Sequence, residues 1–600
     1  MKKCTRKTMA VVSAILVLLS VLYAFGVAED GQQSDKVQPL LKQKLEMLKE
    51  DDLVQVYIWT TDIDYDEVLA KAEEITGFNE ETIMVEHAPV PAEFFDPDLP
   101  DETWESHVKE YLEKTKEARE KEAADTNLYI GTKREISRAR YSEMQQENIA
   151  QYGITENQIL YVSQYAPMVL AEIPVQKVYE IAKCETVTAV DLLEEREGVD
   201  ATNATALKSV DADYTRNTLG FTGCNVNIGQ IELATPDKTH NDLKSPNIKV
   251  LIANTGSHAT GVARILVGKK GIAPDARLVS VPRGSSYSDF YARIESLISY
   301  RNATDNSLIS VINASTGWER AANEWYRAAE KWLDHVAPMH SVSVVVSAGN
   351  IVSTGIDVLE PGLAYNVITA GGFVDNNSTN PANYALYAES AYANGGSSGC
   401  AKPDLLAPAA NVLGDGVEGT SSSAPVVSGI IAQMLELKPS LANNPTLIKA
   451  ILLAGCAYKF SGETLAGGLT PEQGAGTINA KRAIYVASGN RYLTGTISAS
   501  GTKNHTFAVT SGDAKIRVAL TWTIKNTVSG AHGSGGTVTV PLRANLGLQV
   551  YKPNGSLAAQ KNLQNSSAEL VHMEPPTIGQ NKITVLNYTA TSASYVVAWY

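Results

Sequence analysis

The sequence predicts a central α/β domain with a mainly parallel sheet flanked by helices, preceded by a smaller α+β region and followed by a β-sandwich. From about residue 209, apolar strand-like runs such as "SVSVVVSA" alternate with helical stretches such as "DFYARIESLISYR", the pattern of a parallel sheet with crossover helices. After about Gly489 helical patterns stop and short strands separated by turn residues take over. A chain of 600 residues is also too long for a single hydrophobic core.

The N-terminus has the composition of a secretory signal. A basic start, "MKKCTRK", leads into an apolar run that ends at "GVA" before two acids, which predicts cleavage near Ala28. The apolar run is long enough that an uncleaved membrane anchor is the alternative. We expect residues 1–28 to be removed, the protein to be secreted, extracellular or in the cell envelope, and no stable membrane association after cleavage.

Residues 29–200 carry a β-α-β-β-α-β pattern with a long insertion. "DLVQVYIWTT" predicts the first strand, "DYDEVLAKAEEITGF" the first helix, and residues 158–195 the remaining two strands, helix and closing strand. The segment at about 100–150 is helical and rich in charge. We expect a helical hairpin inserted between strands, with a solvated surface and no chemistry of its own.

Charge and cysteine content exclude several classes of protein. The net charge of −15 divides into +3 over residues 1–50, −22 over residues 51–200 and +4 over residues 201–600. The acidity therefore belongs to one N-terminal block, and the chain has no basic stripe with interleaved aromatics of the kind that binds nucleic acid. The five cysteines show no metal-site spacing and are too few for a disulfide scaffold. We therefore expect no nucleic-acid partner.

Residues 490–600 read as strands such as "IRVALTWTI", "GTVTVPL" and "SYVVAWY", which predicts a β-sandwich. Two of these strands carry Trp522 and Trp599. A carbohydrate-binding or cell-surface module would use such aromatics as a platform, but we expect them to belong to the core.

Four residues in the α/β domain have the side chains and the local contexts that acyl transfer needs. Glu232 ends the apolar strand "NVNIGQIEL", and Asn350 follows the buried strand "VVVSAGN". His258 and Ser421 each stand at a predicted helix start, where unpaired amides and a positive field favour a developing oxyanion. An acid, a base, an amide donor and a nucleophile together form a complete catalytic set.

These stretches resemble the subtilisin-like serine proteases, in which acid, histidine and serine follow one another along the chain. "GTSSSAP" (419–425), "HATGVA" (258–263) with "GIAPDA" (271–276), and "SAGN" match family motifs. The resemblance covers about residues 205–489 and extends to the acidic block, which is similar to the family's inhibitory propeptide. It implies that Ser421 is the nucleophile, His258 the general base and Asn350 the oxyanion donor. It also implies substrate contacts along "VINASTG" and before Asn350, at Ala314, Ser315, Thr316, Gly317, Ser347, Ala348 and Gly349.

The acid position departs from the family pattern, because the usual Asp-Thr-Gly reads Glu232-Leu233-Ala234. A glutamate is longer by one bond, roughly 1.5 Å, and a 1 Å misplacement can cost on the order of 10²-fold in rate. Three alternatives are open: Glu232 performs the acid's role, Asp237 or Asp242 replaces it, or the site is degenerate. The first is the one we favour.

The calcium-binding loop that many relatives carry after the histidine motif is replaced by the short "RILVGKK". We therefore expect no required cofactor and no metal in the catalytic site; calcium elsewhere is possible, with no clear site.

Together these observations predict a secreted zymogen of a serine endopeptidase that acts on polypeptides. Residues 29–200 are its propeptide, an intramolecular inhibitor and folding chaperone, and the mature enzyme begins between Glu194 and Lys208. Residues 201–489 form the catalytic domain and residues 490–600 the C-terminal sandwich. The rival hypothesis is a catalytically inactive protein that keeps the fold as a binding or regulatory surface.

Overall fold

The computed structural model places most of the chain. The expected signal, residues 1–28, and most of the expected maturation segment, 194–206, lie outside the residues it describes. Across the parts that it describes, no helix combines the length and apolarity needed to cross a bilayer. The described residues are 36–84, 101–193, 207–319, 326–350, 358–393, 401–410, 412, 417–457, 459–460, 463–464, 469–509, 515–524, 544–563, 566–573 and 576–600.

The N-terminal region has the predicted β-α-β-β-α-β order. Its antiparallel sheet has the strand order β2-β3-β1-β4. One face of the sheet packs on two helices of the α/β domain, α9 (Tyr287–Ile298) and α10 (Ala328–Met339), through Trp59, Met168 and Leu170. A short helix, α2 (Pro39–Leu45), was not expected. The elements are β1 (Leu53–Thr60), α3 (Tyr65–Thr76), β2 (Ile159–Val162), β3 (Met168–Pro174), α6 (Val175–Ala182) and β4 (Val187–Leu192).

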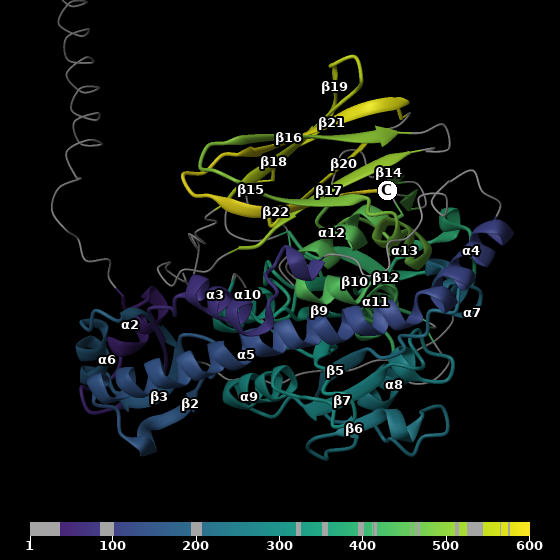
Figure 1. Cartoon of the computed structure of the whole chain (residues 1–600). Coiled ribbons are helices and arrows are strands. Elements are labelled where there is room, and N and C mark those ends of the chain that lie inside the picture. Colours follow the sequence, from purple (N-terminus) through teal and green to yellow (C-terminus); the bar gives the residue numbers. More distant parts are fainter. Residues whose placement is uncertain are drawn as a thin grey trace, which may run out of the picture.

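The insertion is helical but is not a hairpin. It consists of α4 (Asp101–Lys114) and α5 (Lys116–Tyr152), which are separated by Thr115 alone. One residue is shorter than the two to five residues of a helix–helix turn. The 37 residues of α5 run along the whole α/β domain (Figure 1). The expectation of a solvated decoration is also wrong, because residues at helical spacing along α5 are buried from Glu122 to Tyr152.

The central sheet confirms the predicted α/β class. Its strand order is β11-β10-β9-β8-β5-β7-β6, with β12 also pairing with β10, and every pair except β10–β11 is parallel. The strands are β5 (Asn227–Glu232), β6 (Ile248–Val250), β7 (Arg277–Pro282), β8 (Ile309–Ala314), β9 (Ser343–Ser347), β10 (Ile368–Val374), β11 (Ala385–Leu386) and β12 (Leu405–Pro408).

Helices cover both faces of this sheet. Every residue of β5 is buried; Ile228 belongs to the core under α8 and α11, and Ile231 to the core under α9 and α10. β5 is buried on both faces although three of its six residues, Asn227, Gln230 and Glu232, are polar. The helices are α7 (Ala212–Asn217), α8 (Ser257–Val267), α9 (Tyr287–Ile298), α10 (Ala328–Met339), α11 (Thr420–Leu437), α12 (Pro445–Gly455) and α13 (Ala480–Ser488).

The C-terminal region is the predicted β-sandwich, built from two four-stranded antiparallel sheets, β15-β22-β17-β20 and β16-β21-β18-β19. Trp522 is fully buried in the core between the sheets and Trp599 packs against that core, as expected of core residues. The predicted strand "GTVTVPL" lies outside the described residues. The strands are β15 (Tyr492–Ile497), β16 (Thr502–Val509), β17 (Ile516–Trp522), β18 (Leu546–Tyr551), β19 (Leu557–Lys561), β20 (Ala568–Met573), β21 (Gly579–Asn587) and β22 (Ala593–Trp599).

Candidate active site

The acid and the histidine meet where β5 ends and α8 begins. Glu232 is the last residue of β5 and is fully buried, and His258 is the second residue of α8. The carboxylate oxygen Oε2 lies 3.1 Å from the ring nitrogen Nδ1. Two residues earlier on the same face of β5, the Gln230 side chain donates to the Ala259 carbonyl at 2.8 Å. This bond fixes the first turn of α8 against the strand, and with it the position of the imidazole.

Ser315 links the acid to the nucleophile. Its backbone amide donates to the second carboxylate oxygen of Glu232 at 2.9 Å. Its carbonyl accepts a hydrogen bond from the hydroxyl of Ser421, with 3.3 Å between the oxygens. Glu232, which contacts His258, and Ser421 are therefore both held by one residue that immediately follows β8. Although Glu232 has one more methylene than aspartate, its carboxylate is held in place because each of the two oxygens has a defined neighbour.

The start of α11 sets the position of Asn350 relative to Ser421. The Thr420 amide and hydroxyl both donate to the Asn350 side-chain oxygen, at 2.8 and 3.0 Å. The Gly349 amide in turn donates to the Thr420 hydroxyl at 2.9 Å. With its oxygen held in this way, the Asn350 side chain presents its NH₂ group as the donor. The Ser421 amide lies in the first turn of α11, where helix amides have no intrahelical acceptor.

Gly419 is required where α11 begins. Its φ is +76°, in the left-handed region. A Cβ atom built at this position would lie 2.5 Å from the Asn350 side-chain amide. The glycine in the "GTS" motif therefore allows the asparagine to approach the helix start closely.

The expected substrate-binding residues form two neighbouring stretches at the same end of the sheet. Ala314 ends β8 and leads into Ser315, Thr316 and Gly317, and Ser347 ends β9 and leads into Ala348 and Gly349. β8 and β9 pair in parallel, so their carboxyl ends lie side by side.

Leu359 lies between these two stretches and was not anticipated from the sequence. A Cβ atom on Gly349 would lie 2.6 Å from the Leu359 side chain, and one on Gly317 would lie 2.9 Å from it. The Leu359 amide also donates to the Ala348 carbonyl at 2.8 Å. Leu359 therefore lies against both stretches, and we call the place where they face this leucine the slot. No motif marks this residue, and only the fold brings it beside Gly317 and Gly349.

Arg283 is a second residue that sequence reasoning missed. Its guanidinium donates to the Gly317 carbonyl at 2.6 Å and lies over the Trp318 ring, 4.2 Å from the centroid. Its own amide donates to the Glu232 carbonyl at 2.5 Å. Burial lowers the pKa of Arg283 from its ordinary value. The residue ties the acid's strand to the substrate stretch, and its place directly after β7, at the active edge of the sheet, is the signal that could have identified it.

The two alternative acids, Asp237 and Asp242, pair with groups other than His258. Asp242 pairs with the Arg264 guanidinium at 2.5 Å, and this hydrogen bond lowers the pKa of the carboxyl. Asp237 accepts the amide and hydroxyl of Thr239, which likewise lowers its pKa. Glu232 is thus the acid that the structure places against His258. Among the described residues, no three or more His, Cys, Asp or Glu side chains gather as a metal site requires.

A parallel α/β sheet with an acid, a histidine and a helix-start serine at its carboxyl edge defines the subtilisin-like class. Comparison with known proteins agrees: the subtilase family model (Peptidase_S8) matches residues 232–476 of the chain. The match begins at Glu232 and includes His258, Asn350 and Ser421.

Individual relatives are distant. The chain is 25% identical over 267 residues to the serine protease AprX of Bacillus subtilis, covering 39% of this chain and 55% of AprX. It is 27% identical over 214 residues to the subtilase-type proteinase psp3 of Schizosaccharomyces pombe, covering 33% of this chain and 42% of psp3. The chain thus spans about half the length of these curated relatives. The solved prenylagaramide maturation protease PagA is 23% identical, with a TM-score of 0.35, over 44% of this chain and 94% of that one.

Proposed function

We propose that this protein is a serine endopeptidase that hydrolyses peptide bonds through Ser421, His258 and Glu232. The observation that carries the proposal is the contact of the buried Glu232 carboxylate with Nδ1 of His258, with Ser421 held beside the same residue, Ser315. Rotation of the Ser421 side chain turns its hydroxyl from the Ser315 carbonyl to the imidazole. His258 then accepts the proton as the Ser421 oxygen attacks the substrate carbonyl.

Glu232 has two tasks in this mechanism. Contact with Nδ1 holds the imidazole in the tautomer that leaves Nε2 free to accept the serine proton. The carboxylate then offsets the positive charge that forms on the ring. The hydrogen bond from the Ser315 amide and the burial of the side chain hold the carboxylate in one orientation.

The tetrahedral oxyanion is bound by Asn350 and by the Ser421 amide. Because Thr420 holds the Asn350 oxygen, the NH₂ group is oriented before the substrate arrives, and no reorganisation is needed during the reaction. His258 gives the proton it took from Ser421 to the leaving amine, and water then attacks the acyl-enzyme with the neutral His258 again acting as base.

Leu359, which borders the slot, favours substrates with a small side chain directly before the scissile bond. The substrate backbone would pair with residues 314–317 on one side and lie beside residues 347–349 on the other. A side chain entering between them meets Leu359, which already contacts both glycines of the slot. A large aromatic side chain would have to displace this leucine, whereas alanine or serine would not.

We extend the proposal to synthesis as a secreted zymogen. Three observations support it: the signal-like residues 1–28, the acidic N-terminal block, and the packing of the β1–β4 sheet on α9 and α10. The N-terminal region would assist folding and inhibit the site within the same chain.

Purified protein lacking residues 1–28 tests this function. We expect the parent to react with a fluorophosphonate probe, to cleave an unfolded protein substrate and to cut itself near residue 200, whereas Ser421→Ala does none of these. A parent that behaves like Ser421→Ala in all three assays would support an inactive binding or regulatory protein instead.

A further inference from the structure

One buried asparagine lies directly behind the candidate active site. Asn313 is the penultimate residue of β8 and is fully buried. Side chains of a strand alternate between its two faces, so Asn313 lies on the same face as Ser315, two residues further on. In the parallel pairing of β8 with β5, Asn313 lies beside Gln230, whose side chain holds the start of α8.

The Asn313 side chain connects two parts of the site. Its NH₂ group donates to the Ser315 hydroxyl, with 3.0 Å between the heavy atoms. Its oxygen accepts a hydrogen bond from the Ser428 hydroxyl, also at 3.0 Å. Ser428 lies on α11, about two helical turns after Ser421. Asn313 therefore joins the segment that follows β8 to the helix that carries the nucleophile.

The position of Ser315 decides where two catalytic groups lie. Its amide donates to the Glu232 carboxylate, and its carbonyl accepts the Ser421 hydroxyl. The amide and the carbonyl belong to two different peptide planes, which meet at the Cα atom of Ser315. Because Asn313 holds the Ser315 hydroxyl, turning this residue would break a buried hydrogen bond. The bond from Asn313 thus fixes both planes.

Packing alone does not require an amide at this position. Val311 and Ile312, which precede Asn313 in β8, are apolar and buried. Hydrogen-bonded buried groups can often be replaced by apolar groups of the same shape at little cost in stability. An amide differs from an apolar side chain in that its hydrogen bonds have a direction. The contribution of Asn313 is therefore to the geometry of its neighbours.

We propose that Asn313 is a positioning residue for catalysis, which acts through Ser315. By fixing Ser315, it keeps the Glu232 carboxylate and the Ser421 hydroxyl in the places that proton transfer requires. The inference rests on the proposed function, because it assigns a role within that mechanism. Asn313 itself is fully buried and has no contact with the reacting atoms.

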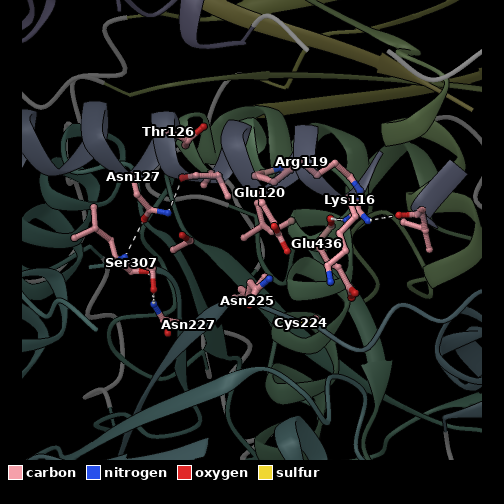
Figure 2. A pocket seen from close by; sticks show the side chains of 18 residues that line it. Lys116, Arg119, Glu120, Thr126, Asn127, Cys224, Asn225, Asn227, Ser307 and Glu436 are labelled. Carbon is pink, nitrogen blue, oxygen red and sulfur yellow. Dashed lines mark hydrogen bonds between the residues drawn. The ribbon is translucent and has the colours of Figure 1, made fainter. Parts of the chain in front are cut away.

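Asn227 is the matched control, at the opposite end of the same sheet. It is the first residue of β5, with 1% of its surface exposed, about 17 Å along the strand from Glu232. Its NH₂ group donates to the Ser307 hydroxyl at 2.8 Å and to the Leu308 carbonyl at 3.1 Å. It borders a cavity of about 230 Å³ between α5 and the α/β domain (Figure 2). Asn227 is thus a buried asparagine with two hydrogen bonds and no connection to the site.

The test compares Asn313→Leu with the parent in two assays. The first measures kcat and KM for a peptide substrate, with kcat expressed per site that reacts with a fluorophosphonate probe. The second measures the rate at which the probe inactivates the protein. The probe reacts with the nucleophile but does not pair with residues 314–317, so this rate reports on the catalytic groups alone.

We expect Asn313→Leu to lower kcat and the inactivation rate by a similar factor, about 10 to 10²-fold, because small displacements at the site are costly in rate. KM should change much less than kcat. Asn227→Leu should leave kcat and the inactivation rate unchanged, even where it lowers the unfolding midpoint. This difference separates a positioning role from a structural one.

Ser428→Ala removes the α11 side of the same connection. We expect a smaller fall in kcat, because the bond from Asn313 to Ser315 remains. Since Ser428 acts through Asn313, the double variant should be no slower than Asn313→Leu alone. If Asn313→Leu does not fold, Ser428→Ala decides the test, and a kcat equal to that of the parent then overturns the inference.

The outcomes separate this inference from the proposed function. An active parent whose kcat is matched by Asn313→Leu would overturn the inference and leave the proposed function in place. An equal loss of kcat in Asn313→Leu and Asn227→Leu would have the same meaning. A parent that neither reacts with the probe nor hydrolyses the peptide would refute the proposed function, and the inference with it.

Discussion

Glu232 contacts the Nδ1 atom of His258 through one carboxylate oxygen and the Ser315 amide through the other. The side chain of Glu232 is one methylene longer than the aspartate of the family pattern. Its carboxylate nevertheless lies against the imidazole. Both carboxylate oxygens have a partner, so the additional torsion does not leave the acid free to turn. This relationship is the physical basis for treating the site as competent.

Asn350→Leu should remove the side-chain donor to the oxyanion while keeping a similar volume. We predict a fall in kcat of about 10² to 10³-fold, with KM nearly unchanged, because the lost hydrogen bond forms only as charge develops on the substrate oxygen. Steady-state hydrolysis of a peptide substrate measures both constants. A variant with the parent kcat would show that Asn350 has no part in binding the oxyanion.

Leu359→Ala should deepen the slot between residues 314–317 and 347–349. We predict that the ratio of kcat/KM for phenylalanine over alanine before the cut rises by about 10 to 200-fold, the range that pocket methylenes provide. Paired peptides that differ only at this residue give the ratio. Leu557→Ala, at an exposed leucine on β19, is the control and should not alter it. If Leu359→Ala leaves the ratio unchanged while the parent is active, the slot does not select the substrate.

Glu295 on α9 should make the free energy of unfolding depend on pH. Its carboxylate accepts the Ser163 hydroxyl at 2.6 Å and the Gln164 amide at 3.2 Å. Burial outweighs these bonds and that of Tyr161, and it raises the pKa of Glu295 to about 7.

A raised carboxyl pKa means that the folded state binds a proton more tightly than the unfolded chain. The stabilising contribution is therefore complete below about pH 4.5 and is lost as pH rises through 7. The difference corresponds to about 3 kcal/mol. Denaturant unfolding of the Ser421→Ala chain between pH 4.5 and 7.5 measures it, and Glu295→Gln should flatten the profile. A parent and variant with parallel profiles would assign the pH dependence to other groups.

The sequence was informative where chemistry requires fixed local contexts. Ser421 must begin a helix after a glycine and Asn350 must follow a buried strand, so both could be placed before the fold was known. Glu232 was identified in the same way, from the end of an apolar strand. The hydrophobic periodicity also predicted the order of strands and helices in the N-terminal region and the C-terminal β-sandwich.

The sequence did not predict the residues that reach the site through long-range contacts. Leu359 and Arg283 join the site from loops whose course is set by the folded domain, and neither lies in a motif. The helix α5 was misjudged because its buried face mixes polar and apolar residues, which weakens the apolar periodicity in the sequence. Arg134 is buried there because its guanidinium donates to four backbone carbonyls that only the fold brings together.

The most direct test of the central claim is the kcat/KM of Glu232→Gln on a peptide substrate, measured beside the parent. Glutamine keeps an acceptor for the Ser315 amide but loses the charge and favours the wrong histidine tautomer. We predict a fall of about 10⁴-fold, with the unfolding midpoint of the protein close to that of the parent. A variant as active as the parent would contradict the account, because Glu232 would then play no part in catalysis.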